Sequence, residues 1–193
     1  ILIEKRIYEK FKFDFCNKVS ELVLGDPIDP KTEFGAITSR AQYEKILAYI
    51  KLSKEQNGSI LIGGKARKLK KRCEGGWFIE PTVIDGLDPE NKLYKEEIFG
   101  PLVTIQRFSS AEEAVNLANS TKYGLSATIW SNDLEKANKI AKQIQSGVIW
   151  INCWMIRDLR TPFGGIKDSG FGKEGGFDAL RFFTEQKNIC SLV

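Results

Sequence analysis

Two arginines precede a glycine-rich run in this sequence. Arg157 and Arg160 lie just before Pro162, and six glycines occur among residues 164–176. An arginine offers a rigid fork of N–H donors that matches a carboxylate, so this stretch could bind a negatively charged group. Glycines permit tight turns and a close approach of the backbone to other atoms. The run therefore predicts a loop pressed against another part of the protein or against a substrate.

The sequence contains four cysteines and no histidine. Without histidine, Ser-His-Asp and Cys-His catalysis and His-ligated metal sites are excluded for this chain acting alone. The cysteines, Cys16, Cys73, Cys153 and Cys190, form no C-x-x-C pair, which argues against a zinc ribbon or a disulfide framework and suits a reducing cytosol. Cys153 lies near the two arginines, but nothing beside it resembles an activating base, so we favour a role in lining a pocket. We therefore expect no metal site.

Composition indicates a globular protein of one domain or at most two. The chain has 193 residues, of which 42% are hydrophobic, enough for a proper core. No apolar run is long enough to span a membrane, and the opening segment is too charged for a signal peptide, so we expect a cytoplasmic protein. Six basic residues lie in segment 65–73. Because no aromatic residue is interleaved with them, a solvated loop is favoured over a nucleic-acid patch.

Periodicity predicts an α/β fold with a largely parallel sheet flanked by helices. Apolar spacing predicts one helix from Ile3 to Leu22, and a second that begins after Ser39. Further helices are expected after a capping box at Ser110 and Glu113, and after Asn132 as N-cap. The expected strands are residues 59–64, 77–84, 102–108, 125–131 and 148–152, and Pro81 makes the second of these an edge or irregular strand.

A dinucleotide-binding motif is also present in outline. Gly170, Gly172 and Gly175 have the G-x-G-x-x-G spacing, but no buried strand precedes them directly, and too few residues follow for the acidic partner. We therefore interpret them as part of the glycine-rich loop. The last segment, residues 182–193, is expected to pass from a helix into a short strand, which must pair with its own sheet or with another subunit.

Three segments together resemble the aldehyde dehydrogenase superfamily: residues 96–103, 119–152 and 162–176, in matching order and spacing. The resemblance extends over nearly the whole chain. It implies that residues 1–185 belong to the catalytic domain and residues 186–193 to an oligomerisation strand, so that a homo-oligomer is expected. It also implies that the nucleophilic cysteine, the general base and the Rossmann domain lie outside this chain, which by itself should be inactive.

The resemblance also implies roles for individual residues. Glu97 would accept hydrogen bonds from the nicotinamide ribose of NAD, with NADP not excluded, and Phe99 would pack against the nicotinamide. Without the family motif, Glu97 would read as a helix-N-terminal or surface carboxylate. Phe163 would line the aldehyde tunnel, with plain core packing as the alternative. Arg157 is the preferred contact for a substrate carboxylate and Arg160 the second choice. Either arginine could instead pair with Asp158 or with a neighbouring subunit.

Among family members, the stretch before Pro162 is most similar to the 2-aminomuconate and 2-hydroxymuconate semialdehyde dehydrogenases. The first hypothesis is therefore the C-terminal portion of an NAD(P)-dependent dehydrogenase that oxidises a carboxylate-bearing semialdehyde to the acid. The alternative is a truncated, non-catalytic relative that acts by oligomerising or by binding a partner. No membrane or nucleic-acid partner is expected, and exposed apolar surface predicts self-association.

Overall fold

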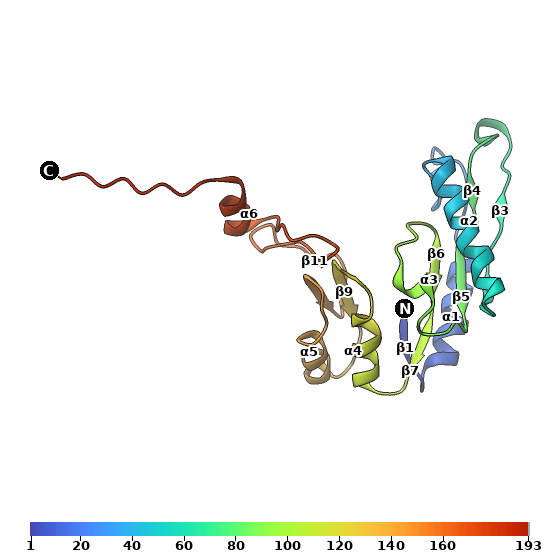
Figure 1. Cartoon of the computed structure of the whole chain (residues 1–193). Coiled ribbons are helices and arrows are strands. Elements are labelled where there is room, and N and C mark those ends of the chain that lie inside the picture. The colour runs from blue at the N-terminus through green and yellow to red at the C-terminus, as the bar shows by residue number, and fades with distance from the viewer. Residues whose placement is uncertain (193) are drawn as a thin grey trace. The chain divides into compact units, whose positions relative to one another are not determined.

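The chain divides into two units, Ile1–Ala114 and Val115–Val193, each with its own strands and helices. The structure is a computed structural model that describes residues 1–192. Figure 1 gives the order of the elements along the chain. None of the helices in the described residues has the length and apolarity that a membrane span requires.

The first unit is built around short strands. Strand β5 (Thr82–Asp85) lies between β2 (Ser59–Ile62), to which it is antiparallel, and β6 (Leu102–Thr104), to which it is parallel. The other elements are β1 (Leu2–Glu4), parallel to β7 (Gln106–Phe108); β3 (Ala66–Arg67), antiparallel to β4 (Phe78–Ile79); and the helices α1 (Tyr8–Ser20), α2 (Arg40–Glu55), the 3₁₀ helix η1 (Lys71–Cys73) and α3 (Lys92–Lys95).

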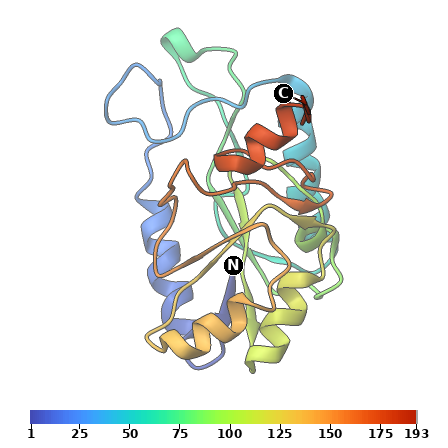
Figure 2. The same ribbon diagram turned by 90° about the vertical axis from the view of Figure 1, so that its left-hand side faces the viewer.

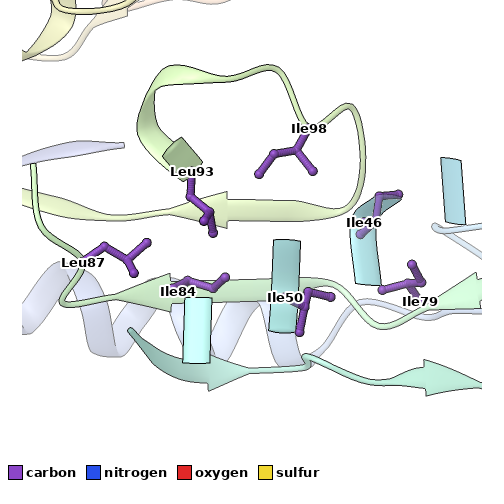
Figure 3. Packing of buried hydrophobic residues seen from close by; sticks show 7 residues of the cluster. All are labelled: Ile46, Ile50, Ile79, Ile84, Leu87, Leu93 and Ile98. Carbon is purple, nitrogen blue, oxygen red and sulfur yellow. The ribbon is translucent and has the colours of Figure 1, made fainter. Parts of the chain in front are cut away.

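Helices α1 and α2 cover opposite faces of these strands. Successive side chains of a strand point to opposite faces, and in β5 Val83 packs with the residues of α1 while Ile84 packs with those of α2. Figure 2 shows α1 and α2 on the two sides of the strands. Figure 3 shows the cluster under α2, which consists of Ile46, Ile50, Ile79, Ile84, Leu87, Leu93 and Ile98. This cluster fixes the base of the loop that follows α3.

The second unit contains a βαβ crossover. Strand β9 (Ser126–Ile129) leads through α5 (Leu134–Ala141) to β10 (Val148–Ile151), which pairs with β9 in parallel. The remaining elements are α4 (Ala111–Asn119), within which the two units meet in the sequence; β8 (Tyr123–Gly124), antiparallel to β11 (Ile166–Lys167); and α6 (Gly176–Phe183).

The α/β class is confirmed. The described residues form three parallel and three antiparallel strand pairs, so the pairing is mixed rather than largely parallel. Ser39 caps α2 as predicted, accepting a hydrogen bond from the Gln42 N–H. One of the two hydrogen bonds of the predicted capping box is present, since the Ser110 hydroxyl oxygen accepts from the Glu113 N–H. The Glu113 carboxylate reaches back to the N–H of Ser109, one residue earlier than expected.

Several predicted elements are corrected. Ile3 lies in β1 rather than in the first helix, which begins at Tyr8. The N-cap of α5 is Asp133 rather than Asn132, because the Asp133 carboxylate accepts the Lys136 N–H. The strand predicted at 77–84 is interrupted at Pro81, which confirms the irregular alternative. The edge alternative is wrong, because the second half, β5, is central.

The predicted terminal strand is not formed in the described residues. Residues 186–192 lie outside any helix or strand, and Val193 lies outside the described part of the chain. A strand is defined by hydrogen bonds to a neighbour, so this segment could become one only beside a partner that supplies them. Its role in oligomerisation stays a prediction, as does the domain boundary at residue 185.

Candidate functional site

The loop that carries Glu97 and Phe99 is fixed to helix α2. The Gln42 side-chain amide donates to the carbonyl oxygens of Ile98 and Phe99, with N···O distances of 2.6 and 2.8 Å. Lys45 Nζ donates to the Glu97 carbonyl at 2.8 Å. Gln42 and Lys45 lie three residues apart and so share one face of the helix. The loop backbone is thus held along its length, while its side chains are left for other contacts.

The side chains of this loop point in opposite directions. Ile98 is buried in the cluster under α2, close to Ile46 (Figure 3). Gly100 passes so close to Ile46 that a Cβ there would lie 2.4 Å from a methyl carbon. Glu97 is exposed, and Phe99 keeps 77% of its surface accessible. Burial of the intervening isoleucine therefore presents a carboxylate and an aromatic ring together on the surface.

Phe99 also has a left-handed backbone, with φ of 58°. This region is costly for a residue with a side chain, and non-glycine residues that occupy it concentrate at functional sites. Here the conformation is imposed by the two carbonyl hydrogen bonds from Gln42 and by the burial of Ile98. A large apolar ring that is held in a strained conformation and left exposed fits a flat ligand ring.

The Glu97 carboxylate takes part in no hydrogen bond or ion pair within residues 1–192, so both oxygens can accept from a ligand. The helix-N-terminal alternative for Glu97 is wrong, because α3 ends at Lys95 and its N-cap is Asn91. The surface reading agrees with its exposure. Two acceptor oxygens beside an exposed ring suit the ribose and nicotinamide of a dinucleotide, so these residues fit the expected cofactor.

Arg157 and Phe163 are brought together in the second unit. The guanidinium carbon of Arg157 lies 4.2 Å from the centre of the Phe163 ring, a cation–π contact. Arg157 Nη2 also donates to Glu174 Oε2 at 3.0 Å, and the Arg157 side chain is 35% exposed. Phe163 is half-buried and its ring supports the arginine, so it is not simply a core residue.

Arg160 has a local partner instead. Its Nε and Nη2 both donate to the Asp158 carboxylate, and its backbone N–H donates to the same group. This pairing holds the pKa of Asp158 below its ordinary value, because Arg160 stabilises the charged carboxylate. The alternative in which one arginine pairs with Asp158 thus describes Arg160 and not Arg157.

The glycine-rich run packs against backbone atoms of its own unit. A Cβ on Gly147 would lie 1.8 Å from the carbonyl oxygen of Gly164, and one on Gly164 would lie 2.3 Å from that of Gly172. Lys173 Nζ donates to the carbonyls of Gly164 and Gly165 at 2.9 and 2.6 Å. The prediction of a loop pressed against another part of the protein is confirmed.

The environment of Cys16 does not favour a nucleophilic role. Burial raises the pKa of the Cys16 thiol, which disfavours the thiolate that nucleophilic attack requires. All four cysteines are free, and Cys153 is half-buried. Residues 1–192 also contain no group of three or more His, Cys, Asp or Glu side chains that could hold a metal ion.

Three residues of the site were missed by sequence reasoning: Gln42, Lys45 and Glu174. Gln42 and Lys45 read as ordinary polar positions of a helix, and nothing in the sequence links them to a loop more than 50 residues away. Glu174 lies inside the glycine-rich run of residues 164–176, so a carboxylate near two arginines was a usable signal. Its pairing with Arg157 depends on how the loop folds.

Comparisons with known proteins identify the family of the chain. The sequence profile of the aldehyde dehydrogenase family matches residues 1–189. The chain is 42% identical to the 2-aminomuconic semialdehyde dehydrogenase of Bos taurus and 40% identical to the 2-hydroxymuconic semialdehyde dehydrogenase of Pseudomonas sp. strain CF600. Each match covers 98% of this chain and 39% of the relative, so the chain spans well under half the length of these curated proteins.

Solved structures give the same result. The crystal structure of PnpE from Pseudomonas sp. WBC-3 matches with a TM-score of 0.89 and 42% identity, over 95% of this chain and 37% of that one. Betaine aldehyde dehydrogenase from Staphylococcus aureus in complex with NAD⁺ matches with a TM-score of 0.88 and 35% identity, over 95% of this chain and 36% of that one. The chain belongs to the aldehyde dehydrogenase family.

Proposed function

We propose that residues 1–193 form the C-terminal portion of an NAD-dependent dehydrogenase that oxidises a carboxylate-bearing semialdehyde to the acid. The observation that carries the proposal is the placement of Arg157, whose guanidinium lies over the Phe163 ring and, within residues 1–192, donates to one side chain, that of Glu174. Relatives at about 40% identity are named for 2-aminomuconic and 2-hydroxymuconic semialdehydes, which supports an unsaturated semialdehyde that carries an acid group.

The residues of the first unit would bind the cofactor. The two oxygens of Glu97 accept hydrogen bonds from ribose hydroxyls, and the Phe99 ring packs against the nicotinamide without competing for its hydrogen bonds. When bound, the dinucleotide supplies the hydride acceptor for the oxidation. NAD rather than NADP is supported by the family structures that contain NAD⁺.

The residues of the second unit would select the substrate. Arg157 binds the substrate carboxylate through the N–H donors that Glu174 does not occupy. The Phe163 ring supports the guanidinium and lines the aldehyde path. Arg160 stays the second choice, because it would have to leave Asp158. The 193 residues alone would have no turnover, since the family resemblance assigns the nucleophilic cysteine and the general base to another part of the enzyme.

The remaining parts of the proposal concern assembly and location. Helix α6 exposes Phe177, Leu180 and Phe183, and apolar surface of this kind favours association. We therefore propose a homo-oligomer in which the segment after α6 pairs with another subunit. The four free cysteines suit a reducing compartment, which supports the cytoplasm.

The exposed apolar face of α6 also favours the second candidate function, a non-catalytic relative that acts through association. The two candidates differ in turnover. A full-length protein that associates but forms no NADH from any aldehyde would support the second candidate and contradict the first.

The experiment is a comparison of two substrates in the full-length protein. We would measure kcat/KM for 2-hydroxymuconic semialdehyde and for hexanal, which has no acid group, through NADH formation. The Arg157→Ala variant is expected to lose about 10- to 100-fold in kcat/KM for the semialdehyde alone, as charged hydrogen bonds contribute about 1.5–3 kcal/mol. The matched variant, Arg160→Ala, should have a much smaller effect. Equal losses for both substrates would contradict a carboxylate contact.

A further inference from the structure

Phe163 and Glu174 face each other across a backbone bridge. The Phe163 N–H donates to the Glu174 carbonyl and the Glu174 N–H to the Phe163 carbonyl, both at 2.7 Å, in antiparallel orientation. Residues that exchange both hydrogen bonds lie directly opposite each other, so their side chains leave the backbone on the same side. One bridge therefore places an aromatic ring and a carboxylate next to each other.

Arg157 contacts both of these side chains. The guanidinium carbon lies 4.2 Å from the centre of the Phe163 ring, and Glu174 Oε2 accepts from Nη2 at 3.0 Å. Two contacts with different parts of the guanidinium restrict its movement. Nε and Nη1 donate to no other residue in the described part of the chain, and these are the donors left for a ligand.

We infer that Glu174 is the positioning residue for Arg157: it holds the guanidinium on the Phe163 ring and turns the remaining donors toward a substrate carboxylate. The inference rests on the proposed function, since it names how that same site is set. Glu174 is itself exposed, and its carboxylate pairs with no other residue in the described chain. An arginine side chain is flexible, and fixing it before the substrate arrives reduces the entropy lost on binding.

The size of the effect follows from the exposure of the pair. Arg157 and Glu174 side chains are 35% and 75% exposed, so their ion pair is screened by solvent and contributes modestly. The expected loss on removing Glu174 is therefore about fivefold in the preference for a carboxylate-bearing substrate, smaller than the loss expected for Arg157 itself. A role of Glu174 in general folding or in the chemical step would change both substrates equally.

The test measures, in the full-length protein, the ratio of kcat/KM for 2-hydroxymuconic semialdehyde to that for hexanal. Glu174→Ala should lower the ratio about fivefold, and Glu174→Gln should restore most of it, because the amide oxygen still accepts from the guanidinium. Asp168→Ala is the matched control, since this exposed carboxylate of the same unit pairs with Lys122 and contacts neither arginine. It should leave the ratio unchanged.

A double variant separates the possible outcomes. If Glu174 acts through Arg157, Glu174→Ala should have no further effect on the ratio in an Arg157→Ala background. Additive losses, or a ratio that rises in Glu174→Ala, would overturn the inference and leave the proposed function standing. If Arg157→Ala itself leaves the ratio unchanged, the proposed function fails. The thermal unfolding midpoint of each variant reports whether it is folded.

Discussion

Replacing Phe99 by glycine and by alanine separates the ring from the strained backbone. Both changes remove the ring of Phe99, a residue that is 77% exposed and buries little surface. They differ at the left-handed φ of 58°, which costs an L-residue about 1–2 kcal/mol and costs glycine almost nothing. Glycine loses about 0.5–1 kcal/mol more chain entropy on folding. We therefore expect Phe99→Gly to be more stable than Phe99→Ala by about 1 kcal/mol.

The assay is thermal unfolding of the two variants, followed by circular dichroism. A difference of this size corresponds to a midpoint about 2–4 °C higher for Phe99→Gly in a chain of this length. Lys51 provides the control, because it is an exposed position inside helix α2. There the order should reverse, with Lys51→Gly about 1 kcal/mol less stable than Lys51→Ala.

Binding of NAD⁺ to the full-length protein completes this test. Both Phe99 variants lack the ring, so both should bind NAD⁺ more weakly, and by a similar factor. Phe99→Ala as stable as Phe99→Gly would refute the left-handed conformation. Unchanged NAD⁺ affinity in both variants would refute the role of the ring, whatever the unfolding midpoints.

Two further predictions concern stability. Gly147→Ala should destabilise the chain by about 1–3 kcal/mol, since its Cβ would overlap the Gly164 carbonyl and backbone atoms must move; Gly35→Ala, which meets nothing within 4 Å, should be neutral by thermal unfolding. Burial raises the pKa of Tyr94 to about 12. The folded state therefore holds this proton up to a higher pH than the unfolded state does. The contribution of the protonated Tyr94 hydroxyl to the free energy of unfolding is complete below about pH 10 and is lost as the pH rises towards 12. Urea denaturation across this range should show a shallower decline for Tyr94→Phe, and an identical decline would contradict the prediction.

The sequence predicted the elements that depend on residues a few positions apart. It did not predict those that depend on pairing between segments distant in the sequence. Ser39 and Ser110 cap helices through atoms three residues away, so the signal lies within one short window. Ile3 was misassigned because it continues the helical spacing of apolar residues, while its actual partner, Arg107 of β7, is more than 100 residues away. Ile7, the N-cap of α1, has no side-chain cap bond, so no local signal marked the true start of the helix.

The residues of the candidate site were also predictable from the sequence only in part. The family motif predicted a role for Glu97 and Phe99, and that role stays a prediction. The structure supplies the reason for their exposure, which is the burial of Ile98 and the hydrogen bonds from Gln42. Hydrogen bonds between a helix face and a loop that is distant in sequence depend on tertiary packing. No spacing rule within the sequence could have found Gln42.

Arg157 and Arg160 are close in the sequence, but their side chains have different partners and so different capacities to bind a ligand. Arg160 and Asp158 are two residues apart, and the carboxylate accepts from the Nε, the Nη2 and the backbone N–H of Arg160, so binding a ligand would require giving up this fork. Arg157 donates once, to a carboxylate carried by another segment, and its ring support stays in place when a ligand arrives. An ion pair that is complete within its own turn stabilises that turn. Arg157, which is held by one acceptor and one ring, keeps donors for a second carboxylate, and this difference favours it over Arg160.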